Sequence, residues 1–290
     1  MNVQLSEAEQ RARKRVCLPL DGLNSLQAIK ERVTELSPVV GLYKIGYETF
    51  TAFGPDSIRL VQASGADVFL DLKYNDIPNT VKGAAGAATR HGVAIFNVHA
   101  SGGVEMMKAA REGVDKAFQE GYDGPRPKVL GVTVLTSFDE ANYLRTFQPL
   151  NPILQNVDLT LYLSMKKDEE VLQREFRDLL EGHGLTGVIQ HQVAHLTGLV
   201  NEAGLDGIIC SAADLQAVRP KYSGLIYGTP GIQGTRTKAG EDQKRVFSPG
   251  NAVQAGSTFL VVGRAITDGK DSEARLRAGY EILQDMAPYV

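Results

Sequence analysis

The sequence is poor in cysteine, has no long apolar run and carries no strong excess of charge. Its two cysteines, Cys17 and Cys210, are not joined by any spacing typical of a metal site. No apolar stretch is long enough to cross a bilayer, and the polar segment 1–15 lacks the apolar core of a signal peptide. The formal net charge of -3 favours neither nucleic acid nor an anionic membrane as a partner. We therefore expect a cytoplasmic protein with both cysteines reduced and in the core.

Short apolar runs alternate with helical patterns along the chain. Near-continuous apolar runs are typical of strands buried on both faces, as a parallel sheet requires. Such runs predict strands at residues 16–20, 39–45, 68–71, 93–98, 129–135, 207–210, 225–228 and 259–263. Helical patterns between them predict helices at residues 24–36, 79–90, 104–120 and 192–203.

This alternation predicts an α/β fold, a (β/α)8 TIM barrel that forms a single domain over residues 1–290. A doubly wound open sheet is the alternative. It is weakened because no glycine fingerprint of the dinucleotide-binding type follows the first predicted strand.

The segment between Ser137 and Gly204 is longer than the single βα unit that a barrel needs there. We interpret about 138–187 as an insertion after the fifth strand, with a charged surface helix at 168–181. It could be a lid, an oligomer contact or a neutral surface insertion, since surface insertions cost little.

The most informative segment is residues 71–81, DLKYNDIPNTV, which follows an apolar run. Side chains two apart on a strand point to the same side, so Asp71 and Lys73 should project together from its carboxyl end. Asp76 follows in the loop, and Pro78 suits a helix start. Placing an acid, a base and a second acid close together costs free energy. Such a cluster therefore indicates a catalytic site at this strand end.

Polar residues also follow the other predicted strands. In a (β/α)8 barrel the catalytic groups lie at the carboxyl ends of the strands and in the loops after them. The residues of interest at those positions are Asp21, Lys44, His99, Ser101, Thr136, Ser137, Pro230, Gln233, Gly263 and Arg264. Ionisable groups at so many strand ends favour an active site, although His99 is more simply interpreted as a hydrogen-bonded structural residue.

Residues 71–80 resemble the Asp-x-Lys-x-x-Asp-Ile-x-Asn-Thr motif of the orotidine 5'-monophosphate decarboxylase family. Further segments similar to the family follow in the right order, at residues 44–46, 98–103, 132–137, 204–212, 229–232 and 262–264. The resemblance covers about residues 15–270 and leaves out the insertion.

The resemblance implies decarboxylation of orotidine 5'-monophosphate to UMP in pyrimidine biosynthesis, without cofactor or metal. Asp71 near the substrate carboxylate would raise the energy of the bound substrate, by roughly 4 kcal/mol at about 4 Å and an effective dielectric of about 20. The Lys73 ammonium would attract the C6 carbanion that forms and then protonate it. We expect Lys73 to stay charged because Asp71 and Asp76 flank it.

The resemblance also implies which residues bind the nucleotide. Lys44 would bridge the charged array and the ribose, and Asp21 would bind a ribose hydroxyl. Ser137 would contact the pyrimidine, while Ile77 and Pro230 would line the apolar side near the departing carboxylate.

For the phosphate, the resemblance implies Arg264 and the amide of Gly263, where barrels of this type often bind phosphate. Many family members close a glutamine over the substrate. Gln233 is the candidate here, and Arg236 in the same glycine-rich, basic loop is its rival.

Asp76 and Thr80 would reach the active site of a neighbouring subunit. The resemblance therefore implies a homodimer with shared active sites.

Two other functions remain open. A metal-dependent sugar-phosphate lyase or decarboxylase of the same suprafamily would share Asp-x-Lys-x-x-Asp, but the extension 77–80 and the turn 229–232 favour the nucleotide enzyme. A non-catalytic binder of phosphate ligands would lack part of the charged array, and none of it is missing. His191 and His195 stand at helical spacing without a carboxylate partner, which is weak evidence for a metal site.

Overall fold

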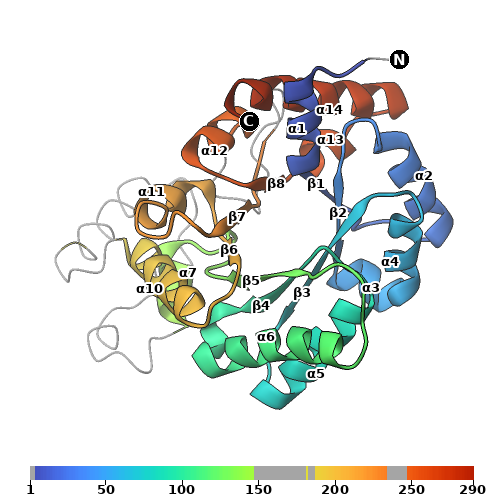
Figure 1. Cartoon of the computed structure of the whole chain (residues 1–290). Helices are drawn as coiled ribbons and strands as arrows, with labels where there is room; N and C mark the ends of the chain where they lie inside the picture. Colours follow the sequence, from blue (N-terminus) through green and yellow to red (C-terminus); the bar gives the residue numbers. More distant parts are fainter. Residues whose placement is uncertain (1–3, 147–180, 182–186, 234–246) are drawn as a thin grey trace.

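The computed structural model describes residues 4–146, 181, 187–233 and 247–290 of the chain. Eight parallel strands form a closed barrel in chain order, and helices surround it (Figure 1). The barrel closes where β1 pairs with β8, with Val16 opposite Leu260. The predicted (β/α)8 barrel is confirmed.

Each strand overlaps one of the predicted apolar runs. The strands are β1 (Val16–Pro19), β2 (Leu42–Gly46), β3 (Asp67–Tyr74), β4 (Ile95–His99), β5 (Lys128–Val132), β6 (Gly207–Ile209), β7 (Ile226–Thr229) and β8 (Phe259–Val261). Several predicted runs extend past the observed strands, because apolar residues before and after a strand are buried as well: Val39, Val40 and Val134 all belong to the core.

The helices include all four of those predicted within the described ranges, as α2, α5, α6 and α10. The α-helices are α1 (Glu7–Arg15), α2 (Leu26–Leu36), α3 (Tyr47–Phe53), α4 (Pro55–Gln62), α5 (Pro78–Arg90), α6 (Val104–Gln119), α7 (Glu140–Arg145), α10 (Val188–Glu202), α11 (Leu215–Val218), α12 (Pro249–Ala255), α13 (Arg264–Thr267) and α14 (Ser272–Met286). Three short 3-10 helices, η1 (Ala100–Gly102), η4 (Ala212–Asp214) and η5 (Ala287–Tyr289), complete the described elements.

Local capping explains where two of these helices begin. The Ser25 hydroxyl accepts a hydrogen bond from the amide of Ala28, so α2 begins at Leu26 and not at residue 24. The polar N-terminal segment, for which the sequence predicted no helix, forms α1, because Ser6 and Glu9 make a reciprocal capping box.

The insertion predicted at 138–187 falls mostly outside the described residues, and so does nearly all of the predicted helix 168–181. Its first described part forms α7.

The barrel interior is filled by a small apolar cluster. Its members come from seven of the strands: Cys17, Leu42, Phe69, Ile95, Leu130, Val132, Ile209 and Phe259. Phe69 and Phe259 meet edge to face with ring centroids 5.8 Å apart. Both cysteines are buried thiols, as the sequence predicted. The polar groups of the candidate site therefore stand on a packed apolar floor.

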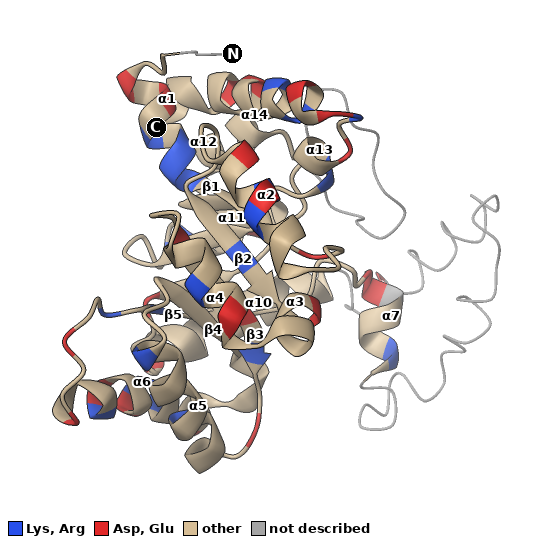
Figure 2. Ribbon diagram, turned by 90° about the vertical axis from the view of Figure 1, so that its right-hand side faces the viewer, with Lys and Arg blue, Asp and Glu red and all other residues tan. Residues whose placement is uncertain are grey.

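The outer surface is mixed in charge. In Figure 2 the helices α1, α6 and α14 each carry acidic and basic side chains. None of the helices within the described ranges is long and apolar enough to cross a membrane.

Candidate active site

A pocket of about 1110 Å³ lies at the carboxyl end of the barrel strands. All but three of the site residues predicted from the sequence line it: Asp21, Lys44, Asp71, Lys73, Ser137, Pro230, Gln233, Gly263 and Arg264. The exceptions are Asp76, Ile77 and Thr80.

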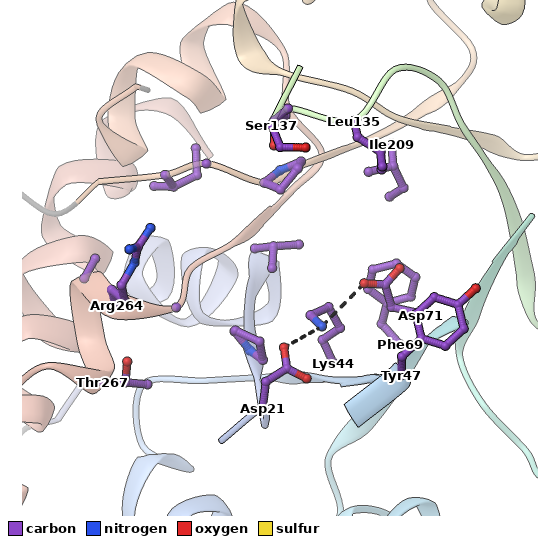
Figure 3. Close-up of a pocket in the computed structure, with 18 of the residues that line it drawn as sticks. Asp21, Lys44, Tyr47, Phe69, Asp71, Leu135, Ser137, Ile209, Arg264 and Thr267 are labelled. Carbon is purple, nitrogen blue, oxygen red and sulfur yellow. Dashed lines mark hydrogen bonds and ion pairs between the residues drawn. The ribbon is translucent and has the colours of Figure 1, made fainter. Parts of the chain in front are cut away.

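Lys44 joins two carboxylates on one side of the pocket. Its Nζ lies 2.9 Å from Oδ2 of Asp21 and 3.4 Å from Oδ2 of Asp71, as the dashed lines in Figure 3 show. Burial alone would lower the pKa of Lys44, but the charges of Asp71 and Asp21 raise it above its ordinary value. Lys44 is therefore a permanent cation in this array.

Gly46 allows this close arrangement. A Cβ atom at Gly46 would lie 2.7 Å from Nζ of Lys44 and 3.0 Å from Oδ1 of Asp21. A Cβ here would displace the Lys44 ammonium from its present position, so the absence of a side chain favours the close packing of the array.

Lys73 is the second cation beside Asp71. Its Nζ lies 2.8 Å from Oδ1 of Asp71 and 5.7 Å from the centroid of the Tyr47 ring. The ammonium is thus held between a carboxylate and an aromatic face. The sequence correctly predicted that Asp71 and Lys73 come together.

The backbone that brings them together is not the regular strand assumed from the sequence. Lys73 has a φ of 41°, the one positive φ among the described residues other than glycine. The pairing of β3 with β4 shifts between Leu70 and Tyr74, which marks a β-bulge. Strained backbone of this kind is often found where a side chain must be aimed at a functional site.

Two residues that the sequence analysis overlooked contact this pair. Asn97 is fully buried and bonds to both Asp71 and the backbone of Lys73. Tyr47 covers the Lys73 ammonium and lines the pocket. The signal for Asn97 was a polar residue inside an apolar strand run, whereas Tyr47, directly after β2, carried no such signal.

The other end of the pocket suits an anion. Arg264 begins α13 directly after Gly263, and Figure 3 places Arg264 on the opposite side of the pocket from Asp71. Gln233 follows Pro230 by three residues and also lines the pocket. Its side-chain Nε2 is buried and has no hydrogen-bond partner within the described residues. Arg236, the rival predicted for the phosphate, lies outside the described residues.

Asp76, Ile77 and Thr80 do not belong to the pocket of a single chain. All three are exposed at the start of α5, and Ile77 is 67% exposed. The Asp76 carboxylate accepts a hydrogen bond from the amide of Ile77 at 2.6 Å. Within one chain, therefore, Asp71 alone of the two predicted acids pairs with Lys73.

His99 also lines the pocket, at the end of β4. Burial lowers its pKa, Lys73 lowers it further, and Asp71 only partly opposes them. His99 is therefore neutral at pH 7.

Within the described ranges no group of three or more His, Cys, Asp or Glu side chains could hold a metal ion. The carboxylates of Asp21 and Asp71 are both paired with the ammonium of Lys44. The charged array thus consists of carboxylates paired with ammonium groups.

Comparisons with known proteins agree with this geometry. A family model described as "Orotidine 5'-phosphate decarboxylase / HUMPS family" matches residues 14–166 and 169–278. An orotidine 5'-phosphate decarboxylase of Geobacter metallireducens is 37% identical over 264 residues, covering 91% of this chain and 93% of the relative. One of Moorella thermoacetica is 36% identical over 271 residues, covering 92% and 91%. The crystal structure of orotidine 5'-phosphate decarboxylase from Lactobacillus acidophilus matches with a TM-score of 0.67 and 28% identity, over 93% of this chain and 98% of that chain.

We predict that His99 makes the fold sensitive to acid. Because the folded state lowers its pKa, the unfolded chain takes up the proton first as the pH falls through the ordinary value of about 6.5. Acidification below that value therefore favours unfolding. The free energy of unfolding in urea, measured from about pH 7.5 to pH 5.5, should fall less steeply for His99→Gln than for the wild type. An equal fall in both proteins would contradict the assignment.

Proposed function

The chain belongs to the orotidine 5'-phosphate decarboxylase / HUMPS family, and from that premise we propose that it converts orotidine 5'-monophosphate to UMP with Lys73 as the proton donor. It is an orotidine-5'-phosphate decarboxylase, a carboxy-lyase of pyrimidine biosynthesis. The match covers 93% and 91% of the length of two such relatives. The metal-dependent sugar-phosphate enzymes of the suprafamily are not favoured.

The observation that carries the mechanism is the alternating array Asp21–Lys44–Asp71–Lys73. We place the substrate carboxylate beside Asp71, where the two like charges repel. This repulsion is relieved as carbon dioxide leaves and the ring carbon C6 takes up the negative charge. Lys44 and Lys73 hold the Asp71 carboxylate in place, with Nζ atoms at 3.4 Å and 2.8 Å from its oxygens.

Lys73 then acts on the carbanion. Its ammonium is already in place, so it stabilises the developing charge without reorganisation of solvent. Proton transfer from Nζ to C6 gives UMP and leaves a neutral amine, which takes up a proton from solvent before the next turnover.

The remaining pocket residues bind the nucleotide. Asp21 and Lys44 bind the ribose, and Ser137 contacts the pyrimidine. Arg264 and the backbone amide of Gly263 bind the 5'-phosphate. The buried Nε2 atom of Gln233, a donor without a partner within the described residues, supports the assignment of Gln233 as a phosphate or pyrimidine contact. Pro230 lines the apolar side.

We propose a homodimer in which each site is completed by the neighbouring subunit. The residues that would be shared, Asp76, Ile77 and Thr80, are exposed at the rim of the barrel mouth. Tyr47 and Leu135 are exposed as well, at 57% and 36%, and both line the pocket. Exposed apolar side chains around a charged site favour a covering partner. Asp76 of one subunit would then flank Lys73 of the other.

We propose further that the reaction needs neither metal nor cofactor, since Asp21 and Asp71, the two carboxylates of the charged array, are already paired with lysine. The partners are the nucleotide and a second subunit, with no role for nucleic acid or a membrane. The two buried thiols support a cytoplasmic location.

Decarboxylation, followed by the ultraviolet absorbance of orotidine 5'-monophosphate, should proceed fully in EDTA. Lys73→Ala should lower kcat by at least about 10⁴-fold, because the variant loses both charge stabilisation and the proton donor. Lys82→Ala is the matched control, since Lys82 is a surface lysine of α5 paired with Glu112. Activity that disappears with the chelator, or a Lys73→Ala enzyme as active as the control, would contradict the proposal.

Shared sites can be tested by subunit mixing. Lys73→Ala and Asp76→Ala should each be nearly inactive alone. Co-expressed with different affinity tags, they should form hybrid dimers with one site that carries both changes and one that carries neither. Random pairing gives about a quarter of the wild-type activity, and purified hybrids give about half. Hybrids isolated through both tags that stay inactive would show that Asp76 does not act across the interface.

A further inference from the structure

We propose that Asn97 of β4 is a positioning residue that sets the geometry of Asp71 and Lys73, an inference that rests on the function proposed above for this pair. Asn97 does not line the pocket and would not touch the substrate. It acts through the two residues that do.

Both ends of the Asn97 side chain are used. Its Nδ2 donates to Oδ1 of Asp71 at 2.7 Å, and its Oδ1 accepts from the backbone amide of Lys73 at 2.8 Å. The side chain has no solvent-exposed surface, so it has no competing water partners. These two contacts also fix the orientation of the amide, because a flipped amide would face donor to donor and acceptor to acceptor.

The same contacts hold the bulge in β3. Leu70 pairs with Phe96 and Tyr74 pairs with Val98, so Asp71, Leu72 and Lys73 stand opposite the single residue Asn97. The backbone of the single residue Asn97 cannot form ladder hydrogen bonds with all three residues of β3 that stand opposite it. The side-chain oxygen of Asn97 therefore accepts the hydrogen bond from the Lys73 amide. This bond stabilises the left-handed backbone of Lys73, which aims its ammonium at Asp71.

A primary amide meets both demands at every pH. A leucine of similar volume offers neither donor nor acceptor. An aspartate keeps the acceptor for Lys73 but, when ionised, places a second carboxylate against Asp71. When protonated, that carboxyl can donate to Asp71 as the amide does. The kcat of Asn97→Asp should therefore be higher at acidic pH, where the new carboxyl is protonated, than at basic pH, where it is ionised.

The charged and titratable groups around this position are few. Asp71 and Lys73 face it from β3, and Lys44 of β2 and His99 of β4 act on it through them. On β5 the residue opposite Asn97 is Leu130, which is apolar. A new pH dependence in Asn97→Asp would thus come from the pair of carboxyl groups.

The test compares kcat, KM and UMP affinity of Asn97→Asp, Asn97→Leu and wild type across pH. The ratio of kcat for Asn97→Asp to that of wild type should fall at least about tenfold from pH 5.5 to pH 8.5. Asn97→Leu should lose at least about a hundredfold in kcat at every pH, with KM and the calorimetric Kd for UMP within about fivefold. Thr133→Val is the control, because Thr133 is buried and its side-chain hydroxyl donates one hydrogen bond, to the carbonyl of Ile209, outside the array.

A flat ratio for Asn97→Asp, or a kcat of Asn97→Leu equal to that of Thr133→Val, would overturn the positioning role and leave the proposed function intact. If Asn97→Leu does not fold, the pH profile of Asn97→Asp decides alone. A wild-type enzyme without decarboxylase activity would overturn the proposed function and this inference with it.

Discussion

The structure depends on one carboxylate held between two ammonium groups. Asp71 lies 2.8 Å from Nζ of Lys73 and 3.4 Å from Nζ of Lys44, and Lys44 also holds Asp21. The carboxylate of Asp71 is nearly buried above the apolar floor of the barrel. Leaving a buried charge without any partner typically costs about 3–5 kcal/mol, and two lysines on Asp71 mean that loss of either one leaves the other in place. In this array each charged group therefore lies next to a group of opposite charge.

The barrel supplies the positions of these charges. β1, β2 and β3 are neighbours, and their register sets Pro19 opposite Lys44 and Gly46 opposite Asp71. The array therefore crosses the carboxyl ends of three adjacent strands. The anion-binding end, around Arg264, follows β8 on the other side of the pocket. A nucleotide can thus be held by its phosphate at one end while its reacting carbon lies at the other.

The sequence predicted the barrel and most of the pocket, because buried parallel strands leave apolar runs and catalytic groups follow their carboxyl ends. It did not predict the bulge at Lys73, since side-chain alternation assumes a regular strand and a positive φ is rare for lysine. Asn97 was overlooked for a related reason: it lies within the predicted strand, and its partners are defined only by the bulge. The role of Asp76 depends on a second subunit. Neither the sequence pattern nor the structure of a single subunit can test that role. For the insertion at 138–187, length indicated an added segment but no periodicity fixed its role.

The central claim is that the ammonium of Lys73 delivers the proton to C6. The reverse of that step can be observed without carbon dioxide, as exchange of the C6 hydrogen of UMP in deuterated water, followed by loss of its proton NMR signal. The wild type should catalyse this exchange. Lys73→Ala should bind UMP but exchange at least about a thousandfold more slowly. Exchange at the wild-type rate by UMP-bound Lys73→Ala would contradict the account.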